Sequence, residues 1–521
     1  MRSISLFVSF AALALAFPAL AEARDFRVLE TRIEKASTAQ GSSRPSIRQI
    51  HFAADGASLL TIGEDGTVMR WDLRKEQATS LLPGKRRFRD GDRVSLSPNQ
   101  RHLAVWDVPS IPLWDLTTGS KVRGIPIVEK RNRAYSVGRV VYSPDGKWLA
   151  GTVPDRVLVG VWDVSSGKEV SRLEGYARFR NAVDFYLPCL LFSPDSQVIA
   201  APSPDRRSLW FHDARTGKFL QELSMKQPGM IYTLAFSRDG RMVAGGCQDN
   251  SLHIWERRTG GERIRFTDLR DTPKALAFDF SNRWLASASE DGMLRIWNVL
   301  SGERIRYLPD PKGALYCVQF SPDGRLLAAG GPKSTVFLWD MTKVLNNLKS
   351  RAEKFTVAEL ESLWADLQQS ETERAYRAMA RLVRSPQAAV SFLKTHQQPA
   401  LTPHDAVVAR LMRDLDSDQF AIREKAQTEL LKLGERIEGA LSRTLAQRPS
   451  LEIRRRVEDV LENLKVQKVR AARVVEVLEH IGNADARAFL AELARGASEA
   501  ELTGEAKAAL ERLCRRRVSQ R

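Results

Sequence analysis

The side chains best suited to acid–base or metal chemistry are the histidines and cysteines, and their spacing matches no known site. The seven histidines are His51, His102, His212, His253, His396, His404 and His480. No two of them have the His-Glu-x-x-His spacing of a zinc enzyme, and no cysteines have the Cys-x-x-Cys spacing of a metal or haem site. The chain has no Gly-rich phosphate loop and no Gly-x-Ser-x-Gly nucleophile elbow. We therefore expect no catalytic residue, no cofactor and no metal ion.

Positive charge is the stronger chemical signal. The 521 residues include 80 Lys+Arg and 63 Asp+Glu, a formal net charge of +17. The excess is concentrated in two segments, KRRFRDGDR (85–93) and EKRNRAYSVGR (129–139). A field of one sign raises the local concentration of anions, so the two segments together predict a basic patch that binds an anion or a partner. The alternative is that these charges only keep the protein soluble. The expected members of the patch are Lys85, Arg86, Arg87, Arg89, Arg93, Lys130, Arg131, Arg133 and Arg139.

An aspartate recurs in the sequence Ser-Pro-Asp-Gly, for example at Asp145 and Asp323, and in the variant Ser-Arg-Asp-Gly at Asp239. One such aspartate could be catalytic, but its repetition indicates architecture. Proline presets φ for a turn, aspartate hydrogen-bonds its own backbone, and glycine accepts a positive φ. We expect each of these aspartates to be a turn residue.

The elements around these turns repeat seven times. An aromatic slot recurs at steps of 42 to 50 residues, and in one copy a histidine replaces the tryptophan. Each copy reads as four short strands separated by turn residues, which is the pattern of a propeller blade. The sequence therefore predicts an all-β, seven-bladed propeller over residues 24–345. The slots are Trp71, Trp114, Trp162, His212, Trp255, Trp297 and Trp339.

These repeats resemble the WD40 family over about residues 25–340. The Trp-Asp pair is present in four copies, whereas the Gly-His that usually opens such a repeat is absent throughout. The resemblance implies that the propeller closes by pairing an N-terminal strand with the last blade. The segment FRVLETRI (26–33) is the candidate strand, and the last blade contains Trp339. Closure would remove a sheet edge that is prone to aggregation.

From about Lys349 the hydrophobic period changes, and the sequence predicts an all-α domain over residues 346–521 with a core of its own. Roughly ten short helices are expected from their capping signals. AIREKAQTELLKLG from Ala421 and EIRRRVEDVLENL from Glu452 are alike and resemble HEAT-type helical pairs. The alternative is an irregular helical bundle. The capping signals are Thr356 with Glu359, Ser370 with Glu373, Ser385-Pro386, Thr402-Pro403, Gly434 and Gly482.

The first residues have the layout of a secretory signal peptide. Arg2 precedes an apolar run (4–17), and small residues allow cleavage after Ala21 or Ala23. The alternative is an uncleaved anchor; no later stretch is apolar enough to span a bilayer. We expect residues 1–23 to be removed and the mature chain to be soluble in the periplasm or outside the cell. The four cysteines, which are expected to be buried and unpaired rather than disulfide-bonded, are Cys189, Cys247, Cys317 and Cys514.

The whole arrangement resembles exported WD40-repeat proteins of some bacteria. That resemblance and the lack of catalytic motifs favour a non-enzymatic protein-interaction scaffold of the cell envelope. The alternative is a polyanion-binding module that uses the basic patch for an acidic glycan, anionic lipid headgroups or nucleic acid. An enzyme of unrecognised type is a third alternative.

Overall fold

The computed structural model describes residues 26–30, 45–82, 94–107, 109–127, 138–153, 158–176, 187, 189–205, 207–225, 229–267, 269–309, 313–345, 353–400, 405–447 and 449–520. The expected signal peptide (1–23) lies outside these residues.

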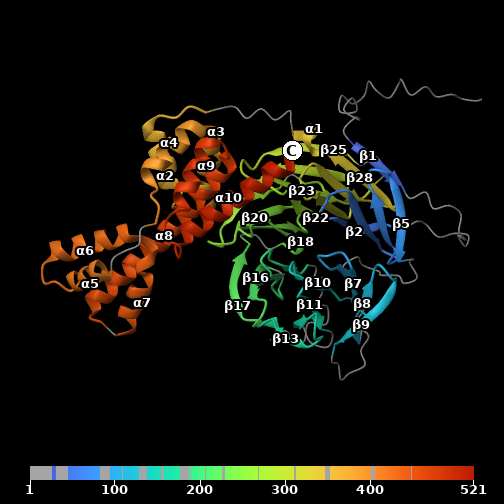
Figure 1. Cartoon of the computed structure of the whole chain (residues 1–521), viewed down its shortest axis with the longest axis horizontal. Helices are drawn as coiled ribbons and strands as arrows, with labels where there is room; N and C mark the ends of the chain where they lie inside the picture. The colour runs from blue at the N-terminus through green and yellow to red at the C-terminus, as the bar shows by residue number, and fades with distance from the viewer. Residues whose placement is uncertain are drawn as a thin grey trace, which may run out of the picture.

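The strands form seven four-stranded antiparallel sheets arranged in a ring, which confirms the predicted propeller (Figure 1). The first three complete blades contain β2 (Ile47–Phe52), β3 (Ser58–Gly63), β4 (Val68–Asp72) and β5 (Gln77–Leu82); β6 (Val94–Leu96), β7 (His102–Val105), β8 (Ser110–Asp115) and β9 (Ser120–Pro126); and β10 (Val140–Tyr142), β11 (Trp148–Val153), β12 (Leu158–Asp163) and β13 (Glu169–Arg172). The next three contain β14 (Leu191–Phe192), β15 (Val198–Pro202), β16 (Ser208–Asp213) and β17 (Phe219–Ser224); β18 (Ile231–Phe236), β19 (Met242–Cys247), β20 (Leu252–Glu256) and β21 (Glu262–Phe266); and β22 (Pro273–Phe278), β23 (Trp284–Ser289), β24 (Met293–Asn298) and β25 (Arg304–Pro309).

The seventh blade closes the ring in the way the sequence predicts. Its strands are β26 (Cys317–Phe320), β27 (Leu326–Gly330), β28 (Thr335–Asp340) and the N-terminal strand β1 (Phe26–Glu30). β1 runs antiparallel to β28, with Phe26 opposite Trp339 and Glu30 opposite Thr335. The N-terminal strand therefore covers the hydrogen-bonding edge that β28 would otherwise expose.

The repeated residues have the structural roles that the sequence assigns to them. Ser143 donates its hydroxyl proton to Asp145 at 2.6 Å, and Gly146 at the end of this turn has a φ of +75°. Five of the six slot tryptophans are buried, and Trp114 is half-buried. The indole N–H of Trp71 donates to Thr61 Oγ1 at 2.8 Å. His212 is also buried in its slot, with Nε2 3.0 Å from the carbonyl oxygen of Glu174. Burial lowers the pKa of His212, so its imidazole is neutral and serves packing.

The C-terminal part of the described chain is helical, as predicted. Its helices are α1 (Met341–Leu345), α2 (Val357–Asp366), α3 (Thr372–Arg384), α4 (Pro386–His396), α5 (Asp405–Asp414), α6 (Phe420–Leu433), η4 (Gly434–Ile437), α7 (Glu438–Ala446), α8 (Leu451–Ile481), α9 (Ala484–Leu493) and α10 (Glu501–Gln520). The expected short helix from Glu452 is wrong in length, because it forms only the first part of the 31-residue α8. No glycine or proline interrupts the sequence before Gly482, so nothing ends the helix earlier.

Four of the expected helix caps are confirmed, and one of them is Gly434, which ends α6 with a φ of +71°. Thr356 and Glu359 form the capping box of α2. Pro386 stands at the first position of α4, and Gly482 ends α8 with a φ of +59°. The cap expected at Thr402-Pro403 lies outside the described residues.

The expected capping box of Ser370 with Glu373 is wrong. α3 begins one residue later, after Glu371, and no side chain caps its first turn. Glu373 therefore stands at the second helical position, where its carboxylate is out of register for the reciprocal bond.

The helices contribute to two apolar clusters, one shared with the propeller and one made of helices alone. We call α2–α4, the second half of α8, α9 and α10 the proximal lobe, and α5–α7 with η4 and the first half of α8 the distal lobe. The proximal lobe packs in one hydrophobic cluster with β18–β24, whereas the distal lobe has a separate cluster. Figure 1 shows the distal lobe projecting away from the propeller. The division of the chain at residue 345 and the independent folding of residues 346–521 stay predictions.

The cysteines are unpaired, as the sequence analysis predicts. Cys189, Cys247 and Cys317 are buried in the propeller. Cys514 is exposed on α10, so the expectation that it is buried is wrong. Cys514 lies on α10, outside the propeller repeats, so the repeat pattern that predicts burial of the other three cysteines does not apply to it.

Candidate functional site

Most of the predicted basic patch lies outside the described residues. Lys85, Arg86, Arg87, Arg89, Arg93, Lys130, Arg131 and Arg133 all fall there, so their grouping stays a prediction. Arg139 is described and is half-buried. Its backbone N–H donates to Thr152 Oγ1 at 3.0 Å, and its Nε donates to the carbonyl oxygen of Leu187 at 3.1 Å. The Arg139 side chain therefore joins two neighbouring blades, and at least part of its donor capacity is used within the fold.

A buried group of four alternating charges joins the propeller to the helices. Arg263 of β21 contacts Glu256 at 2.9 Å and Glu476 at 2.8 Å, and Arg473 contacts Glu256 at 2.7 Å. Glu256 ends β20, whereas Arg473 and Glu476 lie one turn apart on α8. The four side chains are at most 6% exposed. We call Glu256, Arg263, Arg473 and Glu476 the charge cluster.

Local structure explains why the cluster includes Glu256. In five of the other six blades an aspartate follows the slot residue. Asp163 is an example, and it caps the next turn by accepting from the Ser166 N–H at 2.6 Å. Glu256 has one more methylene, and its carboxylate accepts instead from both arginines and from Thr259 Oγ1 at 2.6 Å. The longer side chain therefore turns a blade-capping position into a contact with α8.

Arg473 also completes the end of a helix. Its Nη1 donates to the carbonyl oxygens of Leu367 at 2.7 Å and Gln369 at 3.0 Å, just beyond the last turn of α2. Carbonyl groups at a helix C-terminus lack partners within the helix and carry partial negative charge. Arg473 thus binds β20, α2 and its own helix α8 into one arrangement.

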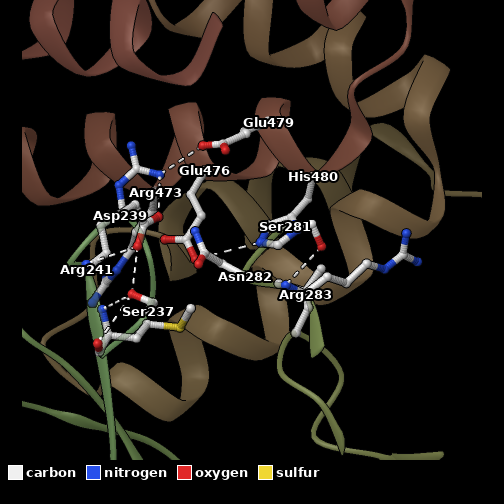
Figure 2. Close-up of polar contacts among 12 residues, drawn as sticks. Ser237, Asp239, Arg241, Ser281, Asn282, Arg283, Arg473, Glu476, Glu479 and His480 are labelled. Atoms are coloured by element: carbon white, nitrogen blue, oxygen red, sulfur yellow. Dashed lines mark hydrogen bonds and ion pairs between the residues drawn. The ribbon is translucent and has the colours of Figure 1, made fainter. Parts of the chain in front are cut away.

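A second set of ion pairs surrounds the charge cluster. Arg241, which precedes β19, contacts Asp239 at 3.6 Å and reaches Glu479 of α8 at 3.2 Å and Glu505 of α10 at 2.5 Å. Arg512 of α10 contacts Glu479 at 2.8 Å. Figure 2 shows Asp239 and Arg241 of the propeller facing the α8 side chains Glu476 and Glu479. Further out, Arg258 pairs with Glu501 and Glu505.

Burial and opposite charge act against one another in the pKa of the acidic members. Burial alone would raise the pKa of Glu256, but Arg263 and Arg473 outweigh it and lower this pKa to about 2. The pKa of Glu476 is likewise lowered well below its ordinary value, because Arg263 outweighs the effect of burial. Arg263 itself lies over the ring of Tyr376 at 4.6 Å from the centroid. Both carboxylates are therefore ionised at neutral pH.

The arrangement suits docking better than catalysis. A cavity of ≈ 420 Å³ borders the charge cluster, and every charged side chain that lines it except Arg257 has an ion-pair partner. Buried ion pairs add little net stability, because the loss of hydration offsets the attraction. They do penalise any arrangement that leaves one charge alone, so the charge cluster specifies how α8 sits on the propeller.

The sequence analysis missed the charge cluster, and one signal could have indicated it. Among the seven copies, only the one with Trp255 has a glutamate after the slot residue. The other signals, Arg473 and Glu476, look like ordinary charges on a helix. Their burial depends on how α8 crosses the blade formed by β18–β21, which the local sequence does not contain.

Comparison with protein families decides the nature of the repeats. The model of the WD domain, G-beta repeat, matches residues 217–256, 270–298 and 302–340. The chain contains WD40 repeats. Each matched WD40 repeat ends on the last residue of a third strand, namely Glu256, Asn298 or Asp340. The first match therefore ends on a member of the charge cluster.

Curated proteins with WD40-like similarity cover only part of this chain. It is 24% identical over 216 residues to the serine-threonine kinase receptor-associated protein of Gallus gallus, which covers 41% of this chain and 56% of that protein. It is 30% identical over 190 residues to the target of rapamycin complex subunit LST8 of Bos taurus, and this match covers 35% of this chain and 54% of that protein. The chain thus spans little more than half the length of these two relatives. The small ribosomal subunit protein RACK1 of Schizosaccharomyces pombe is 28% identical over 123 residues, and this match covers 23% of this chain and 38% of that protein.

Among solved structures, the chain is similar to the β-propeller domain of Cps50 (Swd1) from Myceliophteria thermophila. The TM-score is 0.47 at 20% sequence identity, and the match covers 57% of this chain and 96% of that one. Among the helices that the structure describes, none has the length and apolar character that crossing a membrane requires.

Proposed function

We propose that this chain is a non-enzymatic protein-interaction scaffold in which a WD40 propeller carries a docked helical arm and both present surfaces to partners. The observation that carries the proposal is the charge cluster. Because Glu256 and Arg263 hold α8 by its second half, the first half of α8 extends the distal lobe away from the propeller (Figure 1). A propeller with an arm held at a defined position is suited to bringing two partners together.

The relatives support the same class of function. Their names describe a receptor-associated protein, a complex subunit and a ribosomal subunit protein, which are all members of assemblies. None of these names describes an enzyme. Since the chain spans only part of each relative, the binding of protein partners comes to it as a proposal and not as an established property.

The tip of the distal lobe is the first surface to test. Phe420 at the start of α6 is 61% exposed, and Leu451 at the start of α8 is 84% exposed. The guanidinium groups of Arg423 and Arg456 lie 5.8 and 5.7 Å from the centroid of the Phe420 ring. Aromatic and arginine side chains contribute most to binding energy at protein interfaces. The two helix starts are joined by a contact of 3.6 Å between Arg423 and Glu452.

The test compares proteins cross-linked in cells to the whole chain and to the variant Phe420→Ser/Leu451→Ser. Val357→Ser serves as the matched control, because Val357 is an apolar residue on α2 that is 72% exposed outside the distal lobe. We expect a defined partner to be lost from the tip variant and kept by the control. A chain that recovers the same set of proteins in all three forms, or turns over a substrate, would contradict the proposal.

The polyanion-binding module stays the second candidate function, and the concentration of lysine and arginine in segments 85–93 and 129–139 favours it. The cell-envelope setting is likewise a proposal. It rests on the first residues of the sequence alone, since the relatives named above are eukaryotic proteins and give it no support. N-terminal sequencing of the chain recovered from its cells tests the setting. A start after Ala21 or Ala23 supports export, whereas an intact N-terminus contradicts the signal peptide.

A further inference from the structure

The hairpin between β19 and β20 brings together three side chains of metal-binding type. Cys247 is the last residue of β19, Asp249 lies in the turn, and His253 is the second residue of β20. The N–H of Cys247 donates to the carbonyl oxygen of Ser251 at 2.9 Å, and Gly245 lies opposite His253. Because side chains alternate along a strand, Cys247, Ser251 and His253 occupy the same face of the hairpin. One donor atom from each of Cys247, Asp249 and His253 lies within 4.8 Å of the other two.

The corresponding hairpins of two other blades show what is particular to this one. The positions of Cys247, Asp249 and His253 are filled by Gly63, Asp65 and Met69 between β3 and β4. Between β23 and β24 they are filled by Ser289, Asp291 and Arg295. The aspartate is therefore part of the common architecture of the turn. The thiol and the imidazole are additions that neither of these blades has, and both are soft or borderline metal ligands.

The three donors match the preferences of Zn²⁺. Zinc takes thiolate, imidazole and carboxylate ligands at about 2.0–2.3 Å in tetrahedral geometry. Donor atoms around such an ion stand roughly 3.3–3.8 Å apart, and the three donor atoms here lie within 4.8 Å of one another. The Sδ atom of Met225 is 3.8 Å from Cys247 Sγ and accepts its thiol proton. The fourth position is thus open to this thioether or to a water molecule.

The surroundings of His253 also fit a metal ligand. Its Nδ1 is 3.0 Å from Glu262 Oε1, so a proton on Nδ1 is held by a carboxylate and Nε2 is left for a ligand role. Carboxylates of this kind orient metal-binding histidines. Nε2 now lies 2.8 Å from Ser251 Oγ, which also hydrogen-bonds Asp249. The Ser251 hydroxyl therefore bridges the two groups that a metal ion would bridge.

Access and charge are compatible with an ion. Cys247 and His253 are buried, whereas Asp249 is exposed and gives a path from solvent. Arg265 approaches the second oxygen of the Asp249 carboxylate at 3.4 Å. The first oxygen accepts from the backbone N–H of Ser251 at 3.1 Å and from the Ser251 hydroxyl, so a bound ion would take the place of that hydroxyl. The site lies at the turn end of β20, and the charge cluster begins at Glu256, at the other end of the same strand.

We propose that Cys247, Asp249 and His253 form a zinc site on the propeller, with Glu262 positioning His253. The sequence analysis expected no metal, because it compared the histidines and cysteines with linear spacings. A Cys-x-Asp-x-x-x-His spacing becomes a ligand set only when a hairpin in this register folds it onto one face.

The test measures Zn²⁺ binding to the whole chain after chelation and dialysis, by competition with a chromogenic chelator. All proteins carry Cys514→Ser, which removes the exposed thiol. We expect one equivalent of Zn²⁺ in the parent protein and at least 100-fold weaker binding in Cys247→Ser and His253→Gln. Glu262→Gln should weaken binding about 10- to 100-fold. Cys317→Ser, which changes a buried cysteine in another blade, should bind as the parent does.

Co²⁺ gives a second readout that reports the ligand directly. The parent should show a thiolate-to-cobalt charge-transfer absorption that Cys247→Ser lacks and Cys317→Ser retains. If the core variants do not fold, Asp249→Asn keeps the test open, because this residue is exposed and its change threatens no packing. The proposal is overturned if the parent takes up no Zn²⁺, or if Asp249→Asn and Cys247→Ser bind Zn²⁺ as tightly as the parent. In that case the Ser251 bridge is only a structural hydrogen-bond network.

Discussion

Glu256 and Arg473 stand 217 positions apart in the sequence and are joined by two hydrogen bonds, of 2.7 and 3.2 Å. One ends the third strand of a propeller blade, and the other lies in the second half of α8. Both side chains are almost fully buried, so water cannot hydrate either charge while α8 stays docked on the propeller. This contact makes the relative placement of propeller and helices a property of a few named charges.

Changing Glu256 to glutamine should destabilise the docked arrangement. Arg263 would then keep only the carboxylate of Glu476, and Arg473 would lose its contact with a carboxylate. Loss of one partner of a buried ion pair costs roughly 3–5 kcal/mol. We expect a lower melting temperature by calorimetry and a larger radius of gyration by X-ray scattering. Asp163→Asn is the matched control, because it changes a carboxylate to an amide at the equivalent position of another blade. That blade contributes no residue to the hydrophobic cluster that the propeller shares with the proximal lobe. Equal melting temperatures for the two variants would contradict a role for the charge cluster in docking.

Acid should release the helical region before the propeller unfolds. The pKa of Glu256 is lowered from 4.5 to about 2, since Arg263 and Arg473 outweigh the effect of its burial. A lowered folded-state pKa gives stability that is complete above the unfolded value and is lost as the pH falls through the folded value. The loss should therefore occur between about pH 4.5 and pH 2. X-ray scattering across this range should show expansion, and Glu256→Gln should expand at higher pH than the parent protein.

The sequence predicts the propeller well because its signals are local and repeated. The serine of each Ser-Pro-Asp-Gly turn, the buried slot residues and the strand from Phe26 follow rules that operate within about 40 residues. The pairing of Phe26 with Trp339 spans the chain, yet it follows from counting strands, because the last blade has only three of its own.

The sequence does not predict the charge cluster or the hairpin ligand set, for two different physical reasons. The burial of Arg473 depends on where a long helix crosses the propeller, and no local pattern encodes that crossing. Cys247 and His253 are near one another in sequence, but they share a face only because of the register Gly245 opposite His253. The length of α8 was also underestimated, since similarity to α6 suggested an end where no helix-breaking residue exists.

Removal of the closing strand should destabilise the propeller. Deleting residues 24–34 takes away β1 and exposes the edge of β28, including the backbone of Trp339. We expect the melting temperature to fall by about 5 °C or more, which corresponds to a few kcal/mol for a domain of this size. Deleting residues 1–23 alone is the control and should have little effect. An unchanged midpoint in the longer deletion would refute closure by β1.

The basic patch should bind anionic polymers in a salt-dependent manner. Changing Arg86, Arg87, Arg89, Arg131 and Arg133 together to serine should weaken binding to heparin-like and acidic-lipid surfaces at low salt. The difference from the parent should vanish near 1 M salt, where the screening length falls from about 10 Å at 0.1 M to about 3 Å. Arg139→Ser should lower stability instead, because its Nε holds the Leu187 carbonyl of the next blade. A parent protein that binds no better than the five-residue variant at low salt would reduce the patch to solubilising charge.

A fragment of residues 350–521 should fold alone but melt at a lower temperature than the helices of the whole chain. The distal lobe keeps its own apolar cluster, whereas Tyr376 and Leu360 of the proximal lobe lose their propeller contacts. Circular dichroism measures both properties, and an unfolded fragment would show that the helical region is not an independent domain. Glu476→Gln adds a sharper comparison. It should destabilise the whole chain, where Glu476 faces buried Arg263, but not the fragment, where that arginine is absent. Equal destabilisation in both would mean that the importance of Glu476 lies within the helices and not in docking.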